Sequence, residues 1–222
     1  LRSLEVKITG RVGSDTETQS KIAIEYGLRD DITIGISNSN YLNTFDYFCR
    51  TNYPNKLIDR FGFPFNLVYH SIISTQTDKP LIIDELDRLK FLHQLIIEYN
   101  IKSNIRFRVC PTYLHKNIAD TKLEPKGYPW DMWFLETGLD WFLKSNIEIY
   151  GSLIQQMTDT DISQGSQSAL KAGLQYYFKT ISIDLSITNL YHLHGTAIID
   201  DIGINNYSEN FRIGFQINKM FN

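Results

Sequence analysis

The sequence predicts an all-β protein, a transmembrane up-and-down antiparallel β-barrel of about 12 strands. Three observations support this prediction. Apolar and polar residues alternate along the whole chain, tight and long connections alternate between these segments, and 13 Tyr, 13 Phe and 3 Trp provide many aromatic side chains. No long polar linker interrupts the 222 residues. We therefore expect a single outer-membrane barrel domain over 1–222.

The strands are predicted from period-2 alternation, which places successive side chains on opposite faces of a sheet. The clearest case is 181–188, with the sequence ISIDLSIT, and 147–153 (IEIYGSL) is similar. Twelve segments are predicted in all: 4–13, 20–28, 31–38, 44–52, 63–75, 88–100, 104–114, 130–142, 147–157, 168–178, 181–191 and 209–221. Their Ile, Tyr and Phe content favours strands, because branched and aromatic side chains fit a pleated surface.

The connections predict how the barrel sits in a membrane. Four tight links share one form, with an aromatic residue, a basic residue, small polar residues and then Ile: 26–32, 99–105, 141–147 and 177–181. The links between them are longer and polar, as at 76–87, 115–129, 158–167 and 192–208. Outer-membrane barrels have short periplasmic turns and long extracellular loops. The exception is 53–64, a longer link at a periplasmic position, which is either a plain long turn or a docking site for a partner.

The last segment predicts where both termini lie. Its outward positions carry Phe211, Ile213, Phe215, Ile217 and Phe221. This ending resembles the C-terminal signal that barrel-assembly machinery recognises, although Lys219 stands where an aromatic residue is more usual. An even number of strands places both termini in the periplasm. Leu1 is not preceded by a signal peptide, so we expect such a segment to have been removed or to lie outside this chain.

Composition excludes several other classes of protein. There is no run of about 18 apolar residues, which excludes a transmembrane helix. The mean hydropathy of −0.24 is typical of a soluble protein, but also of a barrel whose strands each face a polar lumen on one side. The net charge of −3 includes no basic stripe of the kind that binds nucleic acid. Two cysteines, Cys49 and Cys110, are too few for a disulfide framework, and whether they pair stays open.

Several short stretches follow one another in a recognisable order: 26–30 (YGLRD) with 34–36 (IGI), then 63–67 (FPFNL), then 111–117 (PTYLHKN). In this order they resemble a family of Bacteroidota outer-membrane β-barrel proteins of unknown function. Gly10-Arg11-Val12-Gly13 resembles the first-strand His-Arg-Phe-Gly of that family, with two substitutions. Thr188-Asn189 matches a family Thr-Asn, but the histidines of the preceding family strand are missing here. The resemblance covers nearly the whole chain, and it implies a barrel in the outer membrane of a Gram-negative bacterium without implying an activity.

The alternation also predicts the charge of the lumen. If the apolar positions face lipid, eight basic and eight acidic side chains face inward. They are Lys7, Arg11, Lys21, Arg50, Arg106, Arg108, Lys171 and Arg212, with Glu5, Glu25, Asp46, Glu98, Glu136, Asp140, Glu148 and Asp184. A Lys or Arg on the lipid face near mid-membrane costs roughly 2–4 kcal/mol, which explains the partition. Equal numbers predict ion pairs across the lumen that narrow or close it.

These charges lead to three hypotheses about function. The first is a structural or accessory subunit of an envelope complex, with a lumen filled by side chains. The second is a narrow channel for small solutes or ions, with Arg106 and Arg108 near Glu98 and Glu148 on the flanking strands as its constriction. The lumen and constriction candidates are Glu98, Arg106, Arg108, Glu136, Glu148, Asp184 and Arg212. The third is a barrel enzyme, and we expect none; a soluble barrel carrier, with its apolar residues inside, is the rival to the membrane location itself.

The enzyme hypothesis depends on histidines. His115, His192 and His194 fall near predicted extracellular strand ends, where a serine and a polar partner could form a hydrolase site. His192 and His194 are also weak metal-ligand candidates, with Asp200 and Asp201 in the same loop. Solvated loop residues are the simpler interpretation, so we expect neither a metal nor a cofactor.

The expected partners follow from the predicted location. They are outer-membrane lipid or lipopolysaccharide, and other envelope proteins that bind the extracellular loops or the 53–64 periplasmic turn. No nucleic-acid partner is expected.

Overall fold

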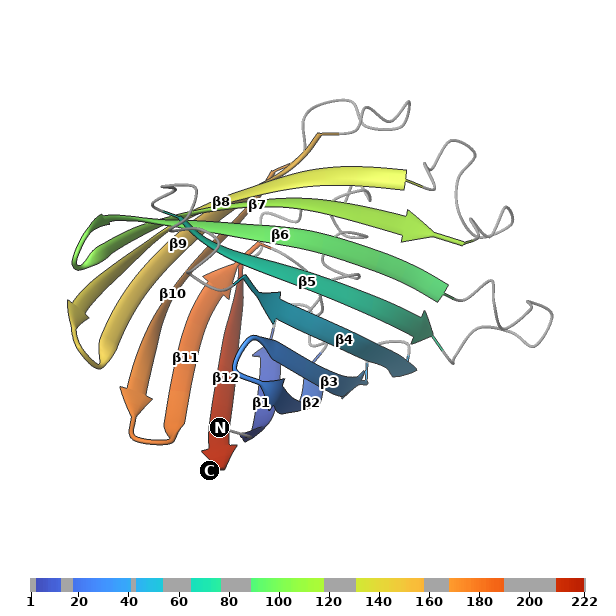
Figure 1. The fold of residues 1–222 in the computed structure, drawn as a ribbon, viewed down its shortest axis with the longest axis horizontal. Helices are drawn as coiled ribbons and strands as arrows, with labels where there is room; N and C mark the ends of the chain where they lie inside the picture. Colours follow the sequence, from blue (N-terminus) through green and yellow to red (C-terminus); the bar gives the residue numbers. More distant parts are fainter. Residues whose placement is uncertain are drawn as a thin grey trace.

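The computed structural model describes residues 3–12, 18–40, 43–53, 65–76, 89–117, 131–157, 168–189 and 211–221. Twelve strands in these ranges form one closed antiparallel barrel (Figure 1). They are β1 (Leu4–Val12), β2 (Thr18–Arg29), β3 (Ile32–Ser39), β4 (Thr44–Asn52), β5 (Phe65–Gln76), β6 (Leu89–Lys102), β7 (Ile105–Lys116), β8 (Asp131–Lys144), β9 (Ile147–Gln156), β10 (Ser168–Phe178), β11 (Ile181–Thr188) and β12 (Arg212–Phe221). The predicted class and the predicted strand number are confirmed, and most strand ends lie within two residues of the prediction.

The barrel closes where the first and last strands meet. β1 pairs antiparallel with β12, from Leu4 opposite Phe221 to Val12 opposite Ile213. Each of the strands β2–β11 pairs with the strand before it and the strand after it in the sequence. Closure leaves no strand edge whose backbone groups would lack hydrogen-bond partners in lipid, and such groups cost several kcal/mol each in a bilayer.

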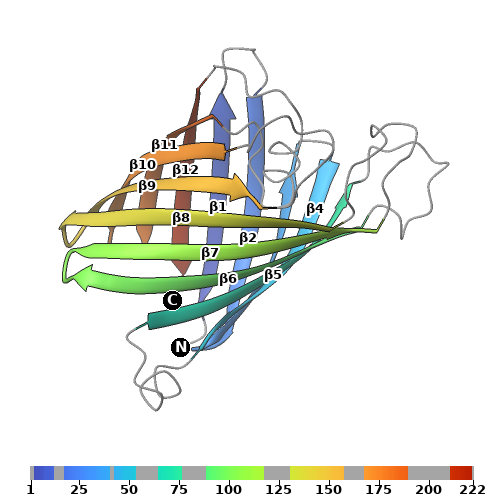
Figure 2. The same ribbon diagram turned by 90° about the horizontal axis from the view of Figure 1, so that it is seen from above.

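The strands are strongly tilted, as barrel closure requires. One row of register partners starts at Leu4 and continues through Tyr26, Ile34, Cys49, Ser71, His93 and Tyr113 to Trp133. Leu4 is the first residue of β1, whereas Trp133 lies near the opposite end of the barrel, so the row climbs as it passes round the wall. Figure 2 shows the result: β1 and β12 on one wall cross the direction of β6–β8 on the other.

The two ends of the barrel differ in their connections. The tight turns Asp30-Asp31, Ser103-Asn104, Ser145-Asn146 and Lys179-Thr180 share one end with the beginning of β1 and the end of β12 (Figure 1). We call this the turn end, and the opposite end the loop end. The first three turns follow a register shift in the incoming strand. Lys179 has a φ of 49°, the left-handed conformation that tight hairpin turns need.

The outer face is an apolar belt. On β12, Ile213 is 67% exposed whereas its neighbour Arg212 is 4% exposed, and the same alternation recurs on the other strands. Exposed aromatic side chains lie near both strand ends: Tyr53, Tyr99, Trp141, Tyr176 and Phe221 at the turn end, and Phe45, Trp133 and Phe211 at the loop end. Apolar residues outside and charges inside are the reverse of a soluble carrier. Within the described residues, no helix is long and apolar enough to cross a membrane.

Candidate functional site in the barrel lumen

The charged residues of the strands face the lumen. Alternation places Arg106 and Arg108 on the inner face of β7, Asp140 on that of β8 and Glu148 on that of β9. The register sets Arg106 directly opposite Asp140, and Arg108 opposite Glu98 of β6. The strand register thus brings oppositely charged side chains together on adjacent strands before any side-chain conformation is considered.

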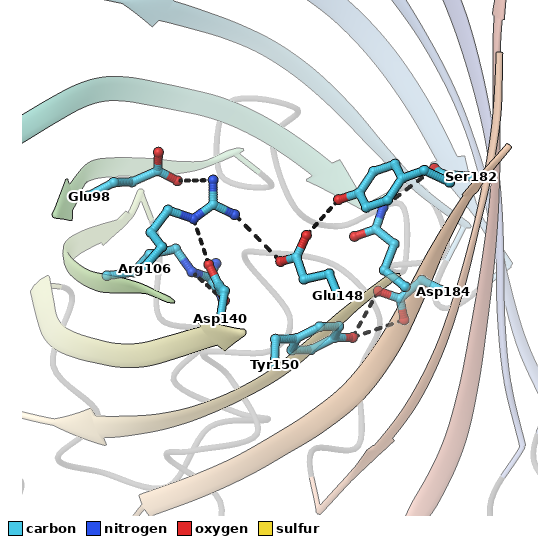
Figure 3. A network of polar contacts seen from close by, with 10 residues as sticks. Glu98, Arg106, Asp140, Glu148, Tyr150, Ser182 and Asp184 are labelled. Atoms are coloured by element: carbon cyan, nitrogen blue, oxygen red, sulfur yellow. Dashed lines mark hydrogen bonds and ion pairs between the residues drawn. The ribbon is translucent and has the colours of Figure 1, made fainter. Parts of the chain in front are cut away.

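Asp140 is the centre of this charged group. Its side chain is fully buried, and both carboxylate oxygens accept hydrogen bonds from guanidinium groups (Figure 3). Arg106 Nε donates to Oδ2 at 2.8 Å, and Arg108 contacts Oδ1 through Nη2 at 2.9 Å. A buried carboxylate needs such partners, because an unpaired charge out of water costs several kcal/mol.

Arg106 extends the group over four strands. Its guanidinium lies 3.6 Å from Glu98 Oε1 on β6 and 3.5 Å from Glu148 Oε1 on β9. Tyr177 of β10 donates its hydroxyl to Glu148 Oε2 at 2.7 Å. Figure 3 shows Arg106 between these carboxylates and Asp140. The result is a continuous polar band on the inner wall near the turn end.

A second polar group lies next to it on β9–β11. The Tyr150 hydroxyl lies 2.9 Å from each carboxylate oxygen of Asp184 (Figure 3). Lys171 Nζ lies 5.0 Å from the centre of the Tyr150 ring, in cation–π range. Gly173 makes room for this ring, because a Cβ there would meet the Tyr150 Cζ and hydroxyl oxygen at 2.5 Å. A glycine is needed here by close approach and not by an unusual backbone conformation.

The opposite wall carries its own ion pairs. Lys7 of β1 pairs with Glu25 of β2, and Arg50 of β4 lies 3.2 Å from the other oxygen of Glu25. Lys21 of β2 lies 2.8 Å from Asp46 Oδ2 on β4. Each of these ion pairs joins strands that are one or two apart, so the pairs described here run along the wall. This corrects the expectation of ion pairs across the lumen, which arose because sequence parity gives the face of a residue but not its position round the barrel.

The predicted constriction residues are only partly brought together. Glu98, Arg106, Arg108 and Glu148 meet, but Glu148 lies two strands from β7, so the expectation that it flanks the arginines was wrong. Asp184 belongs to the Tyr150 pair, Glu136 faces inward opposite Cys110, and Arg212 is buried at the loop end of β12.

Asp140 was among the predicted inward charges, yet it was missing from the constriction set. The sequence did contain an indication of this role, because β7 and β8 follow each other in the chain and Asp140 lies opposite Arg106 when they pair.

An apolar group on the inner face was not predicted. Near the loop end, inward side chains of β5–β8 and β10 pack together and are nearly inaccessible to water: Ile72, Leu92, Leu114, Met132, Phe134 and Ala169, with Phe48 and Ile154 against them. On β5 and β6 apolar residues occur on both faces, so parity alone did not show which of them turn inward. The lumen wall is therefore polar toward the turn end and partly apolar toward the loop end.

Of the catalytic and metal candidates, the structure describes only His115. His115 lies on the outer face of β7, where its Nδ1 is 2.7 Å from Asp131 of β8. His192, His194, Asp200 and Asp201 lie outside the described residues, as does the predicted 53–64 turn apart from Tyr53. Within the described residues there is no group of three His, Cys, Asp or Glu side chains that could hold a metal ion. Cys49 and Cys110 are both free: Cys49 is exposed and Cys110 is buried.

A closed 12-strand antiparallel barrel, apolar outside and charged inside, defines an outer-membrane β-barrel. The chain belongs to the family described as a membrane-bound beta-barrel domain (DUF5777), whose model matches residues 7–221. This confirms the family resemblance, while the Bacteroidota origin stays a prediction. No curated protein sequence matches the chain.

Solved structures with a similar fold include porins. The KdgM porin is similar with a TM-score of 0.65 at 8% identity, covering 98% of this chain and 99% of that chain. The NanC porin has a TM-score of 0.64 at 9% identity, covering 97% and 98%. KdgM in complex with disordered oligogalacturonate has a TM-score of 0.61 at 10% identity, covering 99% of both chains. At these identities the likeness establishes the fold alone.

Proposed function

We propose that this barrel is a narrow outer-membrane channel for small polar solutes or ions, with the turn end in the periplasm. The observation that carries the proposal is the direction of the ion pairs. Arg106 meets its three carboxylates along β6–β9, and Arg50 and Lys7 meet theirs along β1–β4. Charges paired along the wall are stabilised without a bridge across the lumen, so a hydrated path between the two walls is compatible with them.

The partial exposure of these groups supports the same proposal. The side chains of Arg106 and Arg108 are 26% and 25% exposed, and that of Arg50 is 36% exposed, although all three face inward. Water therefore reaches the guanidinium groups that the carboxylates orient. The similar fold of solved porins adds support for a channel.

Single-channel recording in planar lipid bilayers tests this function. We expect discrete, reproducible openings for the purified barrel. Replacing Arg106 by Ala should change the conductance or the ion selectivity, because it removes the side chain that joins the carboxylates of three strands. A barrel that migrates as folded protein but gives no openings would overturn the channel proposal.

The second candidate is a structural or accessory subunit of an envelope complex. The apolar group inside the loop end favours it, since Leu114 and Met132 are completely buried on the inner face. A silent barrel that co-purifies with envelope proteins would support this role. Reproducible openings whose conductance depends on Arg106 would contradict it.

A catalytic role is not proposed. The porin neighbours favour a role other than catalysis. On the outer face, Ser71 Oγ lies 3.4 Å from His93 Nδ1, but Tyr69 occupies the same nitrogen at 2.6 Å. The imidazole is thus engaged by a phenol and is not poised to activate the serine.

A further inference from the structure

An aromatic row crosses the outer face of β5–β8 toward the loop end. Ser71, His93, Tyr113 and Trp133 are consecutive register partners on four adjacent strands. The rings of His93 and Tyr113 are nearly parallel with centroids 6.3 Å apart, and those of Tyr113 and Trp133 are 4.9 Å apart. Trp133 is 54% exposed. The row therefore offers aromatic faces to whatever surrounds the barrel.

A hydrogen-bonded polar group borders the row at the loop end. The Tyr113 hydroxyl donates to Asp131 Oδ1 at 2.5 Å, and His115 Nδ1 approaches the same oxygen at 2.7 Å. The side chain of Asp131 is 57% exposed and that of His115 37%. None of the described outward residues that flank the row is Lys or Arg, so this part of the outer face, as far as it is described, offers no Lys or Arg to a phosphate. Aromatic faces next to a carboxylate and an imidazole suit the apolar face and the hydroxyl groups of a sugar ring.

An apolar groove meets the other end of the row. It has a volume of about 500 Å³ and lies on the outer face of β2–β5, lined in part by Ile34, Ile36, Tyr47, Cys49, Ser71 and Ile73. Cys49 and Ser71 are register partners, so their small side chains make a hollow between larger neighbours. Ser71 belongs both to the groove and to the aromatic row. The groove is apolar and open to the surroundings, which suits one acyl chain.

We propose that this outer surface binds a glycolipid of the outer leaflet, with an acyl chain in the groove and a sugar of its headgroup on Tyr113 and Trp133. The continuity of the groove with the aromatic row selects a sugar that carries an acyl chain over a free saccharide. Asp131 and His115 then bind sugar hydroxyl groups at the loop end. The proposal rests on the orientation proposed above, with the loop end outside the cell, and it does not depend on whether the lumen conducts.

Fluorescently labelled lipopolysaccharide is the probe, titrated by anisotropy into the detergent-purified barrel. We expect Trp133→Leu and Asp131→Asn each to raise the Kd about three- to tenfold, the factor that corresponds to losing about 0.7–1.4 kcal/mol. Cys49→Phe should weaken binding as well, because the larger side chain fills the groove. The matched control is Trp141→Leu, which removes another exposed tryptophan from the turn end of the same strand and should leave the Kd unchanged.

Two competitors identify the ligand class. Phosphatidylglycerol, with acyl chains but no sugar ring, should compete weakly, and deacylated core oligosaccharide should also compete weakly. Strong competition by either would overturn the proposal, in favour of an acyl chain alone or of a free saccharide. Unchanged binding in the Trp133 and Asp131 variants, or equal weakening in the Trp141 control, would overturn it too. Heat-modifiable migration of each variant confirms that the barrel is folded, and conductance recorded on the same preparations reports separately on the channel.

Discussion

Asp140 and Arg106 form the central ion pair of the lumen wall, with Arg106 Nε 2.8 Å from Oδ2 of a fully buried carboxylate. Arg108 takes the other oxygen, so one acidic side chain holds two guanidinium groups of the same strand. The pair arises from register, because Arg106 and Asp140 are direct partners of β7 and β8. Strand order thus decides which of the balanced charges meet.

Asp140→Asn should destabilise the barrel, because it leaves two arginines without their shared carboxylate. Charge-assisted hydrogen bonds to a buried group are worth about 1–3 kcal/mol, so we expect a loss of that size in the free energy of unfolding. Urea unfolding of the reconstituted barrel, followed by heat-modifiable migration, measures it. The control is Glu136→Gln, an inward carboxylate of the same strand opposite Cys110; equal losses in both variants would contradict the central role of Asp140.

Gly173→Ala should displace the Tyr150 ring, since the added Cβ would meet its Cζ and hydroxyl oxygen. The hydrogen bonds to Asp184 would then be lost. Overpacking of this kind costs about 1–3 kcal/mol. A double-mutant cycle measures the coupling: in a Tyr150→Ala background the Gly173 substitution should cost less, and the remaining loss comes from the Leu185 backbone oxygen, which would lie 2.8 Å from the added Cβ. If the double variant loses as much free energy of unfolding as the two single variants together, the effect of the Gly173 substitution does not act through the Tyr150 ring.

Gly10→Ala should weaken the closure between β1 and β12. Gly10 lies opposite Phe215 on the outer face, and a Cβ there would collide with the Phe215 ring. Gly151→Ala is the matched control, because its added Cβ would meet nothing closer than a backbone oxygen at 3.9 Å. We expect slower appearance of the folded, heat-modifiable band on refolding into vesicles for Gly10→Ala alone.

Leu174→Arg and Gln175→Arg test which face of β10 meets lipid. Leu174 is 42% exposed on the outer face, and Gln175 faces inward, where it donates to Ser182. An arginine on the lipid face costs roughly 2–4 kcal/mol near mid-membrane, so Leu174→Arg should lower the free energy of unfolding by about that amount. The neighbouring substitution should cost much less. The reverse order would exclude the assigned outer face.

The cysteines give a chemical test of the same faces. Cys49 belongs to the outer apolar belt, and Cys110 is 2% exposed on the inner face. In sealed vesicles a lipid-soluble maleimide should label Cys49 well before Cys110. A charged maleimide should label neither until the barrel is unfolded. Rapid labelling of Cys110 by the charged reagent would contradict the burial of this side chain on the inner face of β7.

Much of the fold was predictable because the side chains of a barrel strand alternate between its two faces with a period of two residues. Residues 181–188 and 147–153 alternate so regularly that the strands and their faces followed directly, and the four tight turns located one end of the barrel. Prediction failed where apolar residues occur on both faces of a strand. On β5 and β6 apolar residues occupy both parities, so the inner group with Ile72 and Leu92 was not foreseen.

The sequence by itself determined the barrel, the strand number, the outer belt and most of the inward charges, because alternation assigns each side chain to a face. Lys90 and Lys116, which lie opposite each other on the inner face of β6 and β7, were not in the predicted set. Only the tertiary structure decided which charges meet. Because the strands are tilted, each strand is displaced along its neighbour. These shifts place Glu148 within reach of Arg106 across an intervening strand. The same shifts carry the row from Cys49 to Trp133 over the outer surface, where the apolar groove meets the aromatic side chains.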